Sequence, residues 1–352
     1  MSLKISVIAT VKNEEHSIHR LLDSLAAQTR LPDEVIIVDG GSTDGTMRVL
    51  EEYVTGGVLP LRTLVRPGTN IAAGRNAAIE AATHQIIACT DAGVHLSPNW
   101  LADLLCPFEE DGTVPVVSGF FLPDSQTLFE TALGATTLPA LADVDPHHFL
   151  PSSRSVAYRR ETWERVGQYP EWLDYCEDLV FDLRLYELFD AFPFVPQAVA
   201  YFRPRPNLRA FFRQYYRYAR GDGKADTWRK RHLIRYATYL VLLPLLLGLV
   251  IGHSPWWALL LLTGAAFILR RPYQRLGPML SSYGFLDRAR AALWVPIIVV
   301  TGDLAKMLGY PAGVWYRWRH RLPSRRLPTV RQNDESLAPE RHGERITRGT
   351  CR

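Results

Sequence analysis

The sequence predicts an α/β fold with a mostly parallel central sheet flanked by helices, followed by C-terminal membrane helices. Through the first third of the 352 residues, short β-branched runs alternate with amphipathic helical patterns. That order is typical of a parallel sheet with helices on both faces. Farther along, a nearly uncharged stretch extends from Tyr239 to Leu269, and a dense basic segment precedes it.

The elements of the first third follow one another closely. Strands are expected at residues 5–9, 35–38, 61–65 and 85–90, and helices at residues 18–25, 46–53 and 71–82. Asn13 is the expected N-cap of the first helix. The turn after the first strand, Thr10 to Glu15, contains no glycine. This argues against a dinucleotide-binding domain, which needs a glycine-rich loop at that place.

The second strand ends in an acid on a turn, in the segment Glu34-Val-Ile-Ile-Val-Asp-Gly-Gly-Ser-Thr-Asp-Gly-Thr46. Ligands of open α/β sheets bind outside the carboxyl ends of the strands. Asp39 is therefore expected to contact a ribose or a nucleobase. Asp44, in the same turn, is interpreted as a cap of the following helix.

Two apolar runs in the C-terminal half predict a membrane-spanning helical hairpin at residues 236–269, joined through His253-Ser-Pro255. The alternative is a hairpin buried in a soluble core. A third apolar segment, residues 293–314, contains Pro296, Asp303 and Lys306, and we expect it to be interfacial or re-entrant. Residues 316–352 are basic and poor in apolar side chains, so a disordered tail is expected there.

Charge and cysteine content exclude other classes of protein. Residues 203–235 contain eleven Lys or Arg against two Asp, but no nucleic-acid-binding motif accompanies them, and a neighbouring membrane explains the charge better. We therefore expect no nucleic-acid partner. The four cysteines form no C-x-x-C pair, which argues against a zinc or disulfide framework and favours a cytoplasmic location for the first domain.

Five motifs in order resemble those of the family 2 glycosyltransferases, which have the GT-A fold. They are Val7-Ile-Ala-Thr-Val-Lys-Asn-Glu-Glu15, Val35 to Thr46, Gly74-Arg-Asn-Ala-Ala78, Thr90-Asp-Ala-Gly93 and Cys176-Glu-Asp178. A sixth segment, Gln214-Tyr-Tyr-Arg-Tyr218, resembles the Q-x-x-R-W segment of the membrane-associated subgroup, with Tyr218 in place of Trp. The resemblance covers about residues 3 to 235.

The resemblance implies a catalytic domain at residues 1–230, with a nucleotide-sugar half at 1–113 and an acceptor half at 114–230. A membrane region at 231–315 would follow. The implied activity is inverting transfer of a sugar from a nucleotide-diphosphate sugar, first of all a UDP-sugar, to a lipid-linked or membrane-proximal glycan acceptor. The implied location is the cell membrane, with several spans, contacts to membrane lipids and a cytoplasmic catalytic domain.

The resemblance also assigns roles to residues. Asp178 would be the general base and Glu177 would orient the acceptor. The nucleotide sugar would be held by Thr10, Asn13, Glu14, Asp39, Arg75 and Asp91. Gln214, Arg217 and Tyr218 would contact the acceptor or the diphosphate. Considered without the resemblance, Glu177 and Asp178 have an alternative interpretation. They could be solvent-exposed acids at a helix N-terminus, where the helix dipole favours negative charge.

A divalent cation is implied as well, either Mg²⁺ or Mn²⁺ on Asp91. The metal motif here, Asp91-Ala-Gly93, lacks its last acid. Mg²⁺ needs few protein ligands beside a diphosphate, so Asp91 alone could serve. Further ligands could come from His95, or from His147 and His148 beside Asp143 and Asp145. These histidines are equally consistent with ordinary loop residues.

Two other functions remain open from the sequence. One is a membrane-embedded polysaccharide synthase, which the small number of apolar segments disfavours. The other is a nucleotide-sugar-binding, non-catalytic subunit of such a synthase, which the incomplete metal motif permits.

Overall fold

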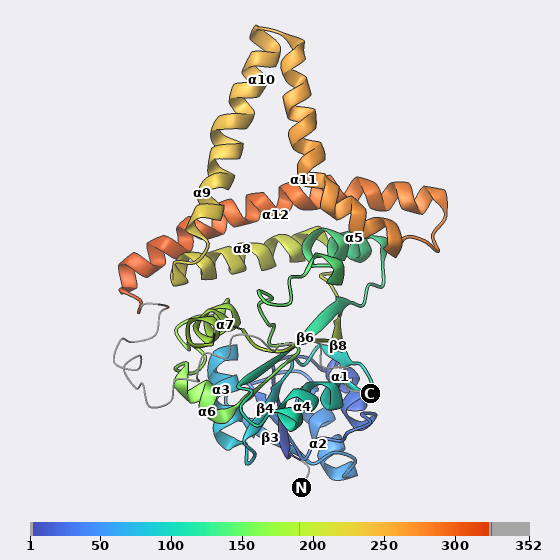
Figure 1. Ribbon diagram of the computed structural model, residues 1–352, viewed down its shortest axis with the longest axis vertical. Coiled ribbons are helices and arrows are strands. Elements are labelled where there is room, and N and C mark those ends of the chain that lie inside the picture. Colours follow the sequence, from blue (N-terminus) through green and yellow to red (C-terminus); the bar gives the residue numbers. More distant parts are fainter. Residues whose placement is uncertain (1–2, 190, 324, 326–352) are drawn as a thin grey trace. The chain divides into compact units, whose positions relative to one another are not determined.

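The computed structural model describes residues 3–189, 191–323 and 325. The chain forms two compact units (Figure 1). The first contains Met1–Leu122 and Val144–Phe202, and the second contains Pro123–Asp143 and Arg203–Pro323. Each unit is described by itself below.

Among the described residues, the first unit is built on an eight-stranded sheet with the order β3-β2-β1-β4-β7-β6-β8-β5. The strands are β1 Ile5–Val11, β2 Glu34–Asp39, β3 Leu61–Val65, β4 Ile86–Cys89, β5 Val94–Leu96, β6 Val116–Pro123, β7 Val156–Arg159 and β8 Phe194–Phe202. The first four strands pair in parallel. The pairs β4–β7, β6–β7 and β5–β8 are antiparallel. The parallel half therefore carries the strand ends at which we expect ligands.

Helices cover both faces of this sheet (Figure 1). They are α1 Ile18–Ala26, α2 Thr46–Gly56, α3 Ile71–Ala81, α4 Trp100–Glu110, α6 Arg160–Arg165 and α7 Glu177–Leu188. Because side chains alternate along a strand, Val7 of β1 packs with α1, α2 and α4, while Ile8 packs with α3, α6 and α7. The two faces thus hold separate hydrophobic cores.

The sequence predicted the elements of the first third closely. The expected strands and helices all form, with ends that differ by no more than three residues. The prediction that Asn13 caps the first helix was wrong, since Ser17 occupies the N-cap position. Asn13 instead has a left-handed φ of 56°, and its side chain accepts a hydrogen bond from the backbone N–H of Thr43 (2.8 Å).

The described part of the second unit is helical (Figure 1). Its elements are α5 Leu128–Thr137, η1 Leu141–Asp143, α8 Leu208–Ala225, α9 Arg229–Ala237, η2 Thr238–Leu242, α10 Leu243–Gly252, η3 Pro255–Trp257, α11 Ala258–Met279 and α12 Phe285–His320. The helix α8, which falls within the expected catalytic domain at residues 1–230, packs along α12. The α10–α11 hairpin runs crosswise to this helix pair (Figure 1).

Glycines let α8 and α12 approach until their backbones touch. A Cβ atom on Gly309 would lie 2.2 Å from the carbonyl oxygen of Tyr216, and one on Gly313 would lie 2.1 Å from that of Arg220. On the facing helix, a Cβ atom on Gly223 would lie 2.3 Å from the carbonyl oxygen of Tyr310. The two helices run in the same direction, and any side chain at these positions would force them apart.

The hairpin exposes its apolar side chains. Ile251 is 87% exposed, Trp256 at the tip 77% and Phe267 79%. The alternative of a hairpin buried in a soluble core is therefore wrong for the described residues. By length and composition, the helices Arg229–Gly252 and Phe285–His320 could each cross a membrane.

The third apolar segment lies within one unbroken helix, α12, which passes through Pro296 and Pro311. Packing along α8 holds it in place, so the local cost of proline does not end it. The helix extends to His320, so the expectation of disorder is wrong for residues 316–320. Residues 326–352 of that tail lie outside the described residues.

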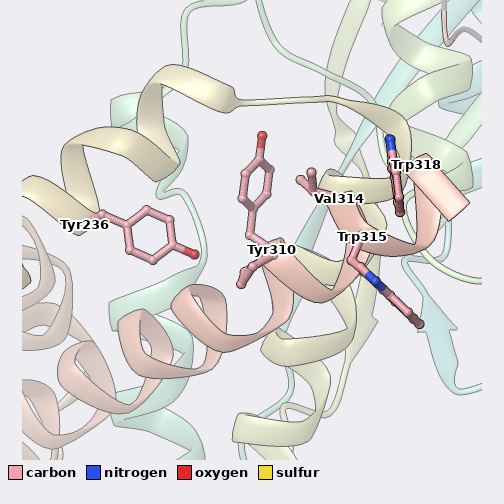
Figure 2. Close-up of a pocket in the computed structure, with 6 residues that line it drawn as sticks. Tyr236, Tyr310, Val314, Trp315 and Trp318 are labelled. Atoms are coloured by element: carbon pink, nitrogen blue, oxygen red, sulfur yellow. The ribbon is translucent and has the colours of Figure 1, made fainter.

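An open apolar hollow of about 640 Å³ lies in the second unit (Figure 2). Its lining is aromatic and aliphatic: Tyr236, Tyr310, Pro311, Val314, Trp315 and Trp318. None of the predicted site residues lines it.

The contact between α8 and α12 gives a first prediction. Gly309→Ala should lower the free energy of unfolding by about 1–3 kcal/mol, because the new methyl group meets backbone that cannot rotate away. The matched control is Gly264→Ala on α11, where no atom lies within 4 Å of the new Cβ. Thermal unfolding of the full-length protein in detergent measures both. Equal midpoints for the two variants would contradict the tight contact.

Candidate functional site

The loops after β1 and β2 are joined by hydrogen bonds. The backbone N–H of Asn13 donates to Ser42 Oγ (2.8 Å), and that of Glu14 donates to Thr46 Oγ1 (2.9 Å). In the other direction, the Gly45 N–H donates to Glu15 Oε2 (3.0 Å). The predicted nucleoside residues Asn13 and Glu14 are therefore held at fixed positions against the turn that follows Asp39.

The Asp39 carboxylate organises its own turn. Its side chain is 1% exposed, and it accepts hydrogen bonds from the N–H groups of Gly41 (3.0 Å) and Ser42 (3.0 Å). The expected contact of Asp39 with a ribose or nucleobase remains a prediction. Asp44 accepts from the N–H of Thr46 (3.1 Å), the first residue of α2, although Gly45 occupies the N-cap position.

Arg75 lies at the centre of the site. It belongs to the first turns of α3, whose N-cap Asn70 accepts from the Ala73 N–H (2.9 Å). Its side chain is only 2% exposed. Nη1 donates to Glu177 Oε1 (2.7 Å) and Nη2 to Asp91 Oδ1 (2.9 Å). One buried guanidinium thus joins the end of β4 to the start of α7.

Asp91 faces a second arginine. Its Oδ2 lies 3.6 Å from Nε of Arg154, whose guanidinium stands 4.4 Å from the ring centroid of Phe202. The Thr90 hydroxyl donates to the carbonyl of Arg154 (2.9 Å), which fixes the two segments together. Burial alone would raise the pKa of Asp91, but Arg75 and Arg154 hold it below its usual range.

Three acids follow one another on α7. Glu177 is 5% exposed and Asp182 is 4% exposed, while Asp178 is half-buried. Burial and the neighbouring Asp178 raise the pKa of Glu177 to about 7, against the opposing charge of Arg75. Burial, again with Asp178, raises the pKa of Asp182 well above its usual range. The reading of Glu177 as a solvated helix N-terminus is therefore wrong, since this side chain is buried and paired.

Several of the predicted residues lie together within the first unit. Arg75 contacts both Asp91 and Glu177 directly. Thr10 packs close to α3, because a Cβ atom on Gly74 would lie 2.8 Å from Thr10 Cγ2. Gln214, Arg217 and Tyr218 belong to α8 of the second unit. There, Gln214 Nε2 donates to Tyr218 Oη (2.8 Å).

Two residues of the site were missed in the sequence. Arg154 lies two residues before the start of β7, and nothing in the neighbouring sequence marks it as a partner of Asp91. Asp182 could have been found, because it stands four residues after Asp178 in a helical pattern. That spacing places both on one face of a helix.

The donor groups at Asp91 do not fit a divalent cation. Both oxygens of this carboxylate already face guanidinium groups, and Gly93 provides no side chain. Glu14 is the acid found beside Gly93, with Oε2 at 4.0 Å from the position of a Cβ, but it bonds to the Ser17 hydroxyl. Among the described residues, no group of three or more His, Cys, Asp or Glu could hold a metal ion.

The histidines considered as further ligands have other surroundings. His95 lies on β5, where Nδ1 is 2.9 Å from Arg20 Nη2 and the ring stacks on Tyr201. His148 is exposed and pairs with Asp145 (2.7 Å). Asp143 belongs to the second unit and pairs there with Arg275 (2.7 Å).

Two family models match the chain. "Glycosyl transferase family 2" matches residues 6–160, and "Glycosyl transferase family group 2" matches residues 86–299, more than half of the chain.

Curated relatives are similar over part of their length. An uncharacterised glycosyltransferase of Nostoc sp. is 25% identical over 186 residues, which are 49% of this chain and 58% of the relative. The chain thus spans less than two thirds of that protein. Glycosyltransferase AglE of Haloferax volcanii is 24% identical over 250 residues, 69% of this chain and 80% of the relative.

A solved structure shares the fold. It is mannosyltransferase PcManGT from Pyrobaculum calidifontis in complex with GDP-Man and Mn²⁺. The likeness has a TM-score of 0.51 at 19% identity and covers 90% of this chain and 87% of that one. The fold is therefore of the GT-A-like α/β class, as expected from the sequence.

The buried guanidinium gives a second prediction. Arg75→Met should lower the free energy of unfolding by about 3–5 kcal/mol, because it leaves Glu177 buried without its cation. Adding Glu177→Gln to Arg75→Met should restore part of this loss, and thermal unfolding measures both variants.

This prediction has a pH dependence with a definite sign. The pKa of Glu177 is raised from 4.5 to about 7, so the folded protein keeps a proton that the unfolded chain releases between these values. The proton on Glu177 therefore stabilises the folded state at low pH, and this stabilisation is lost as the pH rises through 7. Removing Arg75 raises this pKa further, so the substitution should cost more at about pH 8 than at about pH 6. A cost independent of pH would contradict the role of Glu177.

Proposed function

Because the chain belongs to glycosyltransferase family 2, we propose that it transfers a sugar, with inversion, from a nucleotide-diphosphate sugar to a lipid-linked or membrane-proximal acceptor. Family membership and the GT-A-like fold make it a glycosyltransferase. We propose three further points: inversion at the anomeric carbon, the class of acceptor and the roles of the residues.

One observation carries the proposal. Arg75 binds Asp91 and Glu177 at the same time, so the first acid of the D-x-D-like segment and the E-D pair are parts of one site. Two acids from segments this far apart in sequence, held by one buried cation, are typical of a functional site. If the Arg75–Glu177 ion pair only stabilised the fold, it would not require a second, half-buried acid, Asp178, directly beside Glu177.

The transfer needs a base, alignment and charge compensation. We assign the base to Asp178, whose carboxylate would take the proton of the acceptor hydroxyl. The acceptor oxygen then bonds to the anomeric carbon as the bond from that carbon to the diphosphate oxygen breaks. Glu177, held by Arg75 (2.7 Å), would fix the start of α7 so that Asp178 faces the acceptor. Negative charge leaves with the diphosphate and must meet positive groups.

The donor would lie at the strand ends of the parallel half. The joined loops at residues 13–15 and 42–46 support a nucleoside site there. Backbone N–H groups and hydroxyls of these loops suit a base and a ribose. A uridine diphosphate sugar is the first donor to test, with guanosine and thymidine diphosphate sugars as alternatives.

The second unit supports attachment to a membrane. Its hairpin exposes apolar side chains along both arms, and basic residues are dense at its base, in residues 203–235. The aromatic hollow beside α9, with Trp315 and Trp318, has the composition of a membrane–water interface (Figure 2). Since α12 runs crosswise to the hairpin (Figure 1), a spanning hairpin would leave α12 along the interface.

Replacement of the proposed base tests the mechanism. Asp178→Asn should lower transfer by about 100-fold or more, because the amide cannot accept the acceptor proton. Binding of the nucleotide sugar should stay nearly unchanged. Membranes containing the full-length variant are incubated with UDP-, GDP- and dTDP-sugars and lipid extract. Nucleoside diphosphate release and the glycosylated lipid are then measured.

The control for this substitution is Asp174→Asn, an exposed acid of the preceding loop, which should transfer at the wild-type rate. Wild-type turnover by Asp178→Asn would rule out the assignment of the base. A polymeric product, in place of addition of one sugar, would favour a polysaccharide synthase.

Membrane attachment has its own test. Leu245→Arg combined with Leu262→Arg places one charge on each arm of the hairpin, at side chains that are 56% and 65% exposed. Each should cost about 3 kcal/mol in a bilayer, so the full-length variant should be released from membranes by alkaline carbonate. The control is Val58→Arg, an equally exposed apolar residue of the first unit (62%). A wild-type chain that stays soluble and monodisperse without detergent would contradict attachment.

A further inference from the structure

The arginine pair around Asp91 raises the question of what compensates the charge of the diphosphate. In GT-A enzymes this role is implied for a metal ion on the D-x-D acids. Here one acid of that motif is a glycine, and the other is already paired with two arginines. A divalent cation placed at Asp91 would stand beside two guanidinium groups of like charge, which disfavours its binding.

We propose that Arg154 takes the place of the metal ion, so that this chain binds the diphosphate of its donor without a divalent cation. The proposal rests on the donor assignment given above and deepens it.

Arg154 has the position and the exposure for this role. Thr90 and Asp91 hold it at the end of β4, through the Thr90 hydroxyl (2.9 Å) and the Asp91 carboxylate (3.6 Å). Its side chain is 24% exposed, whereas that of Arg75 is 2% exposed. Arg75 donates with both terminal nitrogens to acids and is almost completely buried. Arg154 is therefore the arginine of this pair that a diphosphate can reach.

The surroundings of Arg154 also favour an anion. Its guanidinium stands over the ring of Phe202 (4.4 Å) and within 5.9 Å of that of Phe121, and Nη1 donates to Ser152 Oγ (3.1 Å). The two aromatic rings hold the planar guanidinium group in one orientation. Arginine binds phosphate oxygens in pairs with this geometry.

Gly93 provides a way to restore the missing acid. A Cβ atom there would meet a single neighbour, Glu14 Oε2, at 4.0 Å, and Gly93 is not among the glycines with positive φ. Gly93→Asp should therefore fold without strain. It would supply the acid that the D-x-D motif lacks here, next to Asp91, which faces Arg75 and Arg154, and to Glu14, which bonds to the Ser17 hydroxyl. A cation would then gain a carboxylate that is not already paired.

The test measures binding, with full-length protein in detergent. UDP, GDP and uridine are titrated calorimetrically, once with EDTA and once with Mn²⁺. The wild-type affinity for the diphosphate that binds should differ by less than about threefold between the two buffers. Arg154→Gln should weaken that affinity in EDTA by about tenfold or more, the usual effect of losing a hydrogen bond to a charged group. Its affinity for uridine should stay unchanged.

Three variants sharpen the result. Arg154→Lys keeps the charge and should lose less affinity than Arg154→Gln, which excludes loss of folding as the cause. Arg160→Gln replaces an arginine at the opposite end of β7, which donates to the Ala82 carbonyl, and this variant should bind as wild type. Gly93→Asp should bind more weakly in EDTA, because of its added negative charge, and should recover with Mn²⁺.

The outcomes separate this inference from the proposed function. Diphosphate binding by the wild type only in Mn²⁺, or equal binding by Arg154→Gln, would overturn the inference and leave the donor assignment standing. A Gly93→Asp protein that responds to Mn²⁺ no more than wild type would also count against it. If neither UDP nor GDP binds in either buffer, the donor assignment itself falls, and this inference with it.

Discussion

The buried guanidinium of Arg75 is the interaction on which the candidate site depends. It holds Asp91 at the end of β4 and Glu177 at the start of α7, which is 102 positions away along the chain. A buried charge that loses its partner costs several kcal/mol, so these three groups must come together as the protein folds. The contact therefore decides where α7 begins, and with it the position of the proposed base.

The second unit depends on a different kind of contact, in which side chains are absent. Gly309 and Gly313 of α12 meet the carbonyl groups of α8 directly, and Gly223 of α8 meets α12 in the same way. Close backbone contact fixes the register of two helices without large apolar side chains between them. The apolar side chains of this unit are then free to face outward, as they do along the hairpin.

Local patterns predicted most of the first unit. The strands around β1 and the helix α3 were predicted because hydrophobic periodicity depends on neighbours in sequence. The site was predicted less well, because its contacts join distant segments. The place of Arg75 beside a diphosphate stays a prediction, and its two acid partners, 16 and 102 residues away, were not foreseen. Similarly, Pro296 gave no sign of the unbroken α12, because packing along α8 overrides its local cost.

The hydrogen bonds between residues 13–15 and 42–46 have a consequence for the rate of donor binding. Ordering a flexible side chain on binding costs about 0.5–1.5 kcal/mol, and ordering a loop costs more. Here the two loops hold each other in place before a ligand arrives. Their conformational entropy is therefore lost when the protein folds, not when the ligand binds. At the proposed donor site, a nucleotide would arrive without closure of these two loops, and its association would be limited by diffusion and orientation.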